Sequence, residues 1–548
     1  MKFLKLFSIP KSSYFASEVK RLQRTGSDFY ILQVKILSTI RGYQCVSRAE
    51  AGRLEFTTVI PSGEVILDLY EVVPPLAYVA ITRNARTGRT TYRVIEPVLT
   101  REDEENIAEI KRILLEEQRP SIDELRSRRV EDVLRERVQK IIRRYKIPVH
   151  SEAFDKVFYY VRRDMLGYGK IDLLIRDPQL EDISCDGVGL PVFVWHSRYE
   201  SLPTNIIFES PDELESLLVR LAQKAGKQIS IAQPIVEGAL PEGFRLHATL
   251  AEVSRRGGTF TIRKFREVPF SIVDLIQSGT LPVELAAFLW LIVERKKSLM
   301  VVGATAGGKT TLLNAIATFI RPEAKIVTIE ETPELNLPHE NWVPLVARPS
   351  TDPWSRDVTL FDLLKSALRM RPDYVIVGEV RGEEAFTLFQ AIATGHAGMC
   401  TLHAENADYA VKRLTSEPMN VPPPLIPLMN VFITVRRFVS EERVYRRVVE
   451  VSEAVEAEKL TWNPLFRYDQ VSDKLVRVGE STVLRKIAEE EGLPKSMLGE
   501  ELKRRETILR WLIERKVTDF KRVSRLIRDY SMRPTAVYSA IERGVYEL

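Results

Sequence analysis

The chain has 548 residues, of which 45% are hydrophobic and 28% are charged, as is ordinary for a folded globular protein of several domains. The 80 basic and 75 acidic residues nearly cancel, and the net charge of +5 is small for a dedicated nucleic-acid binder. The three cysteines lie far apart without a Cys-x-x-Cys pair, which argues against a zinc module or a disulfide framework. The longest apolar run, residues 285–293, is far shorter than the roughly 20 residues of a membrane span. We therefore expect a cytoplasmic protein.

The first hundred residues alternate short apolar runs with turns, which predicts strands at residues 54–60, 64–70, 77–82 and 90–95. A charged stretch follows, from residue 101 to about residue 145. Its apolar residues Ile107, Ile110, Ile113 and Leu114 recur at helical spacing. We expect residues 1–146 to form a first α+β module.

A second α+β module is predicted over residues 147–268. It begins with helix-like sequence and continues through strand candidates at residues 171–175 and 192–196. A helix is predicted at residues 211–226. The Gly- and Arg-rich segments 240–250 and 254–265 resemble paired strands, and the proline-containing stretch 266–275 is a plausible linker.

The third module, residues 269–548, has a different pattern of helix, apolar strand, Gly-rich loop and helix. This alternation is typical of an α/β domain with a largely parallel sheet. The C-terminal part is helical and charged, and its apolar residues Leu502, Leu509, Leu512 and Ile513 are expected to form a packing face.

Residues 303–310 match the phosphate-binding pattern G-x-x-x-x-G-K-[ST]. Its glycines allow backbone N–H groups to surround a β-phosphate, and the following helix adds the positive end of its dipole. Lys309 is expected to bridge phosphate oxygens, and the Thr310 hydroxyl is expected to ligate Mg²⁺. The sequence thus predicts a site for ATP and Mg²⁺. The expected contacts are Gly303, Ala304, Thr305, Ala306, Gly307, Gly308, Lys309, Thr310 and Thr311.

Carboxylates follow two further apolar runs. Glu330 and Glu331 end one predicted strand, at the sheet edge where α/β domains bind ligands. Glu379 follows the strand at residues 374–377. A nucleotide-binding fold usually has a magnesium-holding Asp one residue earlier, where this chain has Gly378.

Two histidines, His396 and His403, lie seven residues apart in a segment rich in glycine and threonine. A lone histidine in an apolar segment is more often a satisfied core residue than a functional one. The spacing of this pair matches no metal motif, so phosphate sensing is favoured over metal binding.

Four segments together resemble the secretion ATPases of type II secretion and type IV pilus systems, which also power archaeal flagella. They are GATAGGKTTLLNAI (303–316), TIEETPEL (328–335), RPDYVIVGEVRGEEA (371–385) and TGHAGMCTLHAENA (394–407). EETPEL, EVRGEEA and SEPMNVP are closer to the archaeal branch. The resemblance extends from about residue 165 to the end. It implies a ring-forming protein with a RecA-like P-loop ATPase domain at the C-terminus, preceded by α+β domains of which the second is PAS-like.

The resemblance also implies roles for single residues. Glu330 matches the acid of the family's Asp box, Glu379 the Walker B glutamate that orients or deprotonates the attacking water, and His403 the His box, with His396 a secondary position.

Upstream, the segments 240–250 and 254–265 resemble the family's arginine-bearing N-terminal segments, which makes Arg245, Arg255 and Arg263 candidates for contacting the nucleotide's phosphates. The choice between Arg255 and Arg256 stays open, as does a purely structural role of Arg245 and Arg263 as ion pairs on the strand face.

By this resemblance the chain is an ATP-hydrolysing homohexamer at the cytoplasmic membrane. It would power assembly or secretion of pilin-like subunits through a polytopic membrane platform protein, with no nucleic acid as partner. Two alternatives remain at this stage: a RecA-like nucleic-acid translocase or helicase, and a non-hydrolysing scaffold, which the missing Walker B Asp suggests.

Overall fold

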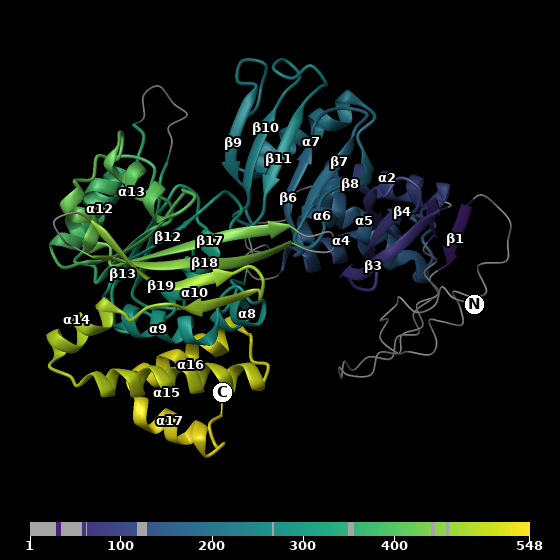
Figure 1. Ribbon diagram of the computed structural model, residues 1–548. Coiled ribbons are helices and arrows are strands. Elements are labelled where there is room, and N and C mark those ends of the chain that lie inside the picture. The colour runs from purple at the N-terminus through teal and green to yellow at the C-terminus, as the bar shows by residue number, and fades with distance from the viewer. Residues whose placement is uncertain are drawn as a thin grey trace. The chain divides into compact units, whose positions relative to one another are not determined.

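The computed structural model describes residues 29–33, 57–61, 63–117, 129–265, 268–348, 356–439, 444–455 and 460–547. Cys45 and the first residues of the predicted strand 54–60 lie outside these ranges. The chain divides into two compact units, Met1–Lys264 and Phe265–Leu548 (Figure 1). The expected boundary between residues 146 and 147 stays a prediction.

The first unit contains a nine-stranded sheet in the order β3-β4-β5-β8-β7-β6-β11-β10-β9. The strands are β3 (Glu64–Val73), β4 (Ala77–Asn84), β5 (Thr90–Ile95), β6 (Leu180–Cys185), β7 (Pro191–His196), β8 (Glu200–Ile207), β9 (Ile235–Ala239), β10 (Arg245–Thr249) and β11 (Thr259–Arg263). A separate antiparallel pair joins β1 (Phe29–Gln33) and β2 (Thr57–Pro61). The expected pairing of segments 240–250 and 254–265 is confirmed in β10 and β11.

Helices of the first unit pack their apolar faces into one core with this sheet. They are α2 (Arg101–Glu116), α4 (Val130–Tyr145), α5 (Phe154–Met165), α6 (Asp172–Arg176) and α7 (Pro211–Lys224). The first of them begins at a capping box in which Thr100 and Asp103 satisfy each other's backbone N–H groups.

The predicted strand at residues 171–175 is wrong, because the segment forms a short 3-10 turn and then α6. Its apolar residues are all buried, so periodicity could not distinguish a buried strand from a buried helix. The carboxylate of Asp172 accepts hydrogen bonds from Arg176 and from the backbone N–H of Tyr168, which favours the helical turn.

The second unit contains a sheet in the order β14-β13-β15-β16-β12-β17-β18-β19-β20. The strands are β12 (Leu299–Gly303), β13 (Ile326–Glu330), β14 (Trp342–Val346), β15 (Tyr374–Val377), β16 (Ala397–Leu402), β17 (Val431–Val439), β18 (Val444–Val455), β19 (Thr461–Asp469) and β20 (Lys474–Arg477). Pairing is parallel from β14 to β17 and antiparallel beyond, so the expected α/β fold with a largely parallel sheet is confirmed.

Helices cover both faces of this sheet, as a parallel sheet requires. One core packs β12 against α8 (Ile272–Gln277), α9 (Val283–Glu294), α10 (Lys309–Ala317), α14 (Thr482–Glu491), α15 (Lys495–Glu514), α16 (Phe520–Met532) and α17 (Pro534–Glu542). The other core packs the opposite face against α11 (Leu360–Leu368), α12 (Glu384–Ala393) and α13 (Ala407–Thr415). The predicted linker 266–275 is partly helical, because Ser271 caps α8 with Asp274. Across the described ranges, no helix combines the length and apolar character of a membrane span.

Candidate functional site

The loop between β12 and α10 has the geometry of a phosphate cradle. Gly308 has a φ of +88°, which favours glycine, and it immediately precedes the first residue of the helix. A Cβ on Gly303 would lie 2.6 Å from the carbonyl oxygen of Val435, so that position has no room for a side chain. No side chain caps α10, and its first N–H groups are therefore available to an anion.

Lys309 opens α10 and is only 8% exposed, and its Nζ donates to the carbonyl oxygen of Ala304 at 3.2 Å. The ammonium thus lies over the loop rather than in solvent. Thr310 follows in the first helical turn and carries a hydroxyl of the kind that ligates Mg²⁺ beside nucleotide phosphates. Loop N–H groups, an ammonium and a hydroxyl are a donor set that fits a nucleotide phosphate with Mg²⁺.

Glu330 ends β13 and is 3% exposed. Its carboxylate accepts the backbone N–H groups of Glu334 and Leu335, each at 3.0 Å, and burial raises its pKa to about 7. On the neighbouring strand end, a Cβ on Gly378 would lie 3.0 Å from the Cγ of Glu330. The glycine that stands in place of the usual Asp therefore makes room for the Glu330 side chain.

Glu379 follows Gly378 and forms an ion pair with Arg381 at 2.8 Å. The same guanidinium contacts Glu331 at 3.2 Å, so one arginine holds two carboxylates beside the loop. Burial alone would raise the pKa of Glu379, but the Arg381 hydrogen bond, with help from the charge of Lys309, holds it below its ordinary value. Glu379 is thus an ionised acceptor at neutral pH.

His403 follows β16, and its Nε2 lies 2.6 Å from the Oγ1 of Thr305 in the phosphate loop. His396 precedes the same strand, at its other end, where its Nδ1 lies 3.1 Å from the carbonyl oxygen of Ala391. The structure therefore brings His403 to the loop and leaves His396 at the opposite edge of the sheet.

Two arginines at this site were not anticipated. Besides Arg381, the hairpin strand β18 contributes Arg446, whose Nε donates to the loop carbonyl of Ala306 at 3.0 Å. Because Arg446 lies 140 residues beyond the loop, no local motif connects them. The one feature of the sequence that could have pointed to Arg446 is the Arg-Arg pair that occurs in both VRRF and YRRV. The two pairs lie opposite each other on the adjacent strands β17 and β18.

The predicted arginines of the first unit lie on or beside strands β10 and β11. Arg245 and Arg263 are exposed and directly opposite each other across these strands, and Arg245 is 4.0 Å from Glu237. Like charges so placed disfavour the pairing unless an anion or an acidic partner compensates them. Arg255 and Arg256 are both exposed in the β10–β11 loop, and the choice between them stays open.

Comparison with known proteins identifies the family. The family profile described as type II/IV secretion system protein matches residues 186–449, and that described as PilB3-like, C-terminal matches residues 473–544. The uncharacterized protein MJ0900 of Methanocaldococcus jannaschii is 41% identical over 392 residues, which are 70% of this chain and 71% of that protein. The type IV secretion system protein PtlH of Bordetella pertussis is 34% identical over 234 residues, covering 38% and 69% of the two chains.

Two solved ATPase structures are also similar, with low TM-scores. The VirB11 ATPase of the Brucella suis type IV secretion system is 26% identical, covers 50% of this chain and 90% of its own, and has a TM-score of 0.26. The Legionella pneumophila ATPase DotB is 20% identical, with coverage of 64% and 92% and a TM-score of 0.38.

The relatives MJ0900 and PtlH exceed 30% identity, and the aligned regions cover 71% and 69% of their lengths. The chain therefore belongs to the type II/IV secretion system protein family of secretion and pilus-assembly ATPases, and the resemblance that its motifs indicated is confirmed.

Proposed function

We propose that this chain is an ATP-hydrolysing motor that assembles or secretes pilin-like subunits. The observation that carries the proposal is the convergence of the phosphate loop, Glu330, Glu379 and His403 at one edge of the sheet. Each follows or ends one of the adjacent strands β12, β13, β15 and β16, whose carboxyl ends meet at that edge.

In this proposal the residues divide the work of phosphoryl transfer, which depends on positioning and charge neutralisation. The loop N–H groups and Lys309 would hold the phosphates, and Thr310 would hold Mg²⁺, which would supply positive charge against the phosphates. Glu379, ionised and held by Arg381, orients the attacking water and accepts its proton. His403 fixes the loop through Thr305.

We propose a homohexamer at the cytoplasmic face of the membrane, acting through a polytopic membrane platform protein. We also propose that Arg245, Arg263 and one of Arg255 and Arg256 reach the nucleotide's phosphates when the first unit closes on it. Hydrolysis would then be coupled to domain movement, as a motor requires.

The test is ATP turnover by the purified chain with Mg²⁺. Lys309→Ala should abolish turnover. Glu379→Gln should retain ATP binding while turnover falls by about 10²-fold or more, because general-base or water-orienting groups contribute on that scale. Glu323→Gln, a change before β13 and away from the loop, is the matched control and should leave both unchanged.

Equal loss of binding and turnover in Glu379→Gln would mean that the residue holds nucleotide rather than water. Turnover absent under every condition, including added lipid, would favour the scaffold alternative. Strong, saturable stimulation by single- or double-stranded DNA would favour a nucleic-acid motor instead.

A further inference from the structure

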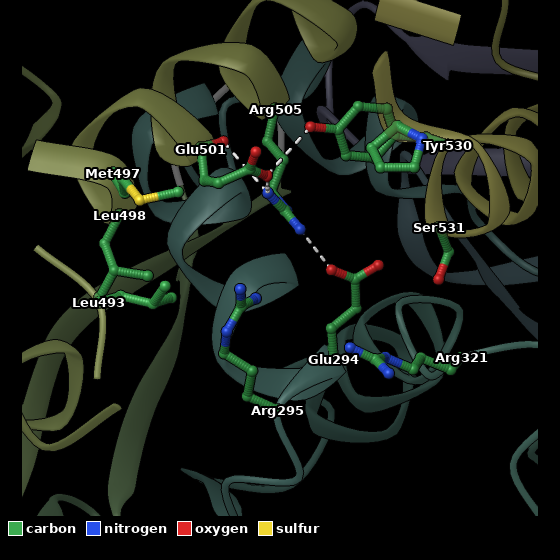
Figure 2. A pocket seen from close by; sticks show the side chains of 11 residues that line it. Glu294, Arg295, Arg321, Leu493, Met497, Leu498, Glu501, Arg505, Tyr530 and Ser531 are labelled. Carbon is green, nitrogen blue, oxygen red and sulfur yellow. Dashed lines mark hydrogen bonds and ion pairs between the residues drawn. The ribbon is translucent and has the colours of Figure 1, made fainter. Parts of the chain in front are cut away.

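A pocket of about 260 Å³ lies among the C-terminal helices, apart from the nucleotide site. It is formed by the end of α9, the segment after α10, the start of α15 and the α16–α17 junction (Figure 2). The helix α10 begins at the phosphate loop with Lys309 and runs away from it to Ala317, about 13 Å at 1.5 Å per residue. Arg321 of the pocket lies beyond that far end, so the pocket belongs to the opposite edge of the sheet.

Three arginines, Arg295, Arg321 and Arg505, line this pocket, and their guanidinium groups face it from different sides (Figure 2). Arg505 is 3% exposed and stacks against Trp290, with its guanidinium 5.4 Å from the ring centre. It donates to Glu501 and to Glu294, but its buried Nε–H has no acceptor among the described residues. A buried donor without a partner is unfavourable.

The charge balance of the lining leaves room for an anion. The two carboxylates that line the pocket, Glu294 and Glu501, both form ion pairs with Arg505. Arg295 is held in place by Glu491 at 3.0 Å, whose own side chain is 40% exposed. Arg321 is exposed and makes no ion pair with any residue that the structure describes, so its charge is available to a ligand.

Two helix N-termini add to this positive field. Neither α15 nor α17 has a side-chain cap, and the first residues of both, Met497, Leu498 and Pro534, line the pocket. The positive ends of the two helix dipoles favour phosphate and other anions.

One wall of the pocket is apolar. Leu493, Met497 and Leu498 lie together on one side of it, away from Arg321 (Figure 2). The volume far exceeds the roughly 30 Å³ that a single water occupies in the liquid, so the pocket has room for more than a bare ion. We propose that it binds a phosphate ester, with the phosphate on the three arginines and a short organic portion against the apolar wall.

A phosphate ester can come from a soluble phosphorylated molecule or from a lipid headgroup, and the experiment separates the two. The full chain is first saturated with ADP and Mg²⁺ to fill the phosphate loop. Glycerol 3-phosphate is then titrated by calorimetry. In a parallel arm, the protein is sedimented with vesicles of phosphatidylcholine, with and without phosphatidylglycerol. Binding of glycerol 3-phosphate indicates a soluble ligand, and binding only to the phosphatidylglycerol vesicles indicates a lipid.

Arg321→Ala should weaken whichever binding is seen by about tenfold, the size of one charge-assisted hydrogen bond, and Arg295→Ala should act similarly. Arg522→Ala removes an exposed arginine of α16 outside the pocket and should change affinity less than about twofold. Saturable binding to neither probe would overturn the proposal. So would binding that Arg321→Ala and Arg295→Ala leave intact, or that Arg522→Ala weakens equally.

Discussion

Glu330 is a site residue whose proton affinity the fold raises. Its carboxyl group has a pKa of about 7 in the folded chain, against 4.5 as its ordinary value, because burial disfavours the charged form. Between these two values the folded chain keeps a proton that the unfolded chain has lost. The resulting stabilisation is fully present below pH 4.5 and is lost as the pH rises through 7.

We therefore predict that Glu330→Gln flattens the pH dependence of the free energy of unfolding. Without nucleotide or Mg²⁺, the variant should match the wild type near pH ~4 and exceed it by about 3 kcal/mol at pH ~8. Urea unfolding followed by circular dichroism across this range measures the difference. Glu323→Gln removes a carboxylate elsewhere in the same unit and should track the wild type. Parallel curves for Glu330→Gln and the wild type would show that Glu330 is charged in the folded chain.

We predict that the hairpin of β17 and β18 stabilises the phosphate loop. It pairs Arg437 with Arg446, and Arg446 holds the phosphate-loop carbonyl of Ala306 at 3.0 Å. Arg446→Ala should loosen the loop and weaken ATP binding by about tenfold, since a charge-assisted hydrogen bond contributes roughly 1.5–3 kcal/mol before solvent exposure reduces it. Fluorescence anisotropy of a labelled ATP analogue measures the affinity.

The control for this prediction is Arg436→Ala, which removes an exposed arginine of β17, the other strand of the hairpin. Arg436 lies opposite Arg447, the residue after Arg446 on β18. Because successive residues of a strand point to opposite faces of the sheet, Arg436 lies on the face away from Arg446, and its removal should leave ATP affinity unchanged. Equal weakening by both variants would indicate a general charge effect of the hairpin rather than a contact with the loop.

The sequence could predict those elements that short-range patterns of residues determine. The phosphate loop, its helix and the apolar strands of the second unit follow from glycine spacing and continuous burial, and the structure has them. The strand predicted at residues 171–175 was wrong because an apolar run fits a buried helix equally well. Arg446 and the Glu330–Gly378 contact were missed because both depend on which strands become neighbours. Sheet order, unlike a loop motif, is set by long-range packing.

At the scale of the whole molecule, the chain consists of two units that each have their own hydrophobic core. The phosphate loop belongs to one unit, and the exposed pair Arg245 and Arg263 belongs to the other. An arginine supplied by a separate mobile domain can accelerate phosphoryl transfer by about 10³- to 10⁵-fold. If the proposed role of these arginines holds, turnover, but not nucleotide binding, should depend on the first unit.

We therefore predict that Arg263→Ala and Arg245→Ala in the full chain retain ATP affinity while kcat falls by about 10³-fold. The alternative, in which Arg245 only pairs with Glu237 on the strand face, is tested by Glu237→Gln. If the ion pair is the whole role, Glu237→Gln and Arg245→Ala should have the same small effect on thermal unfolding, and neither should change kcat. If Arg245 serves the phosphates, only its own removal lowers kcat, because the Glu237→Gln change leaves the guanidinium free to reach them.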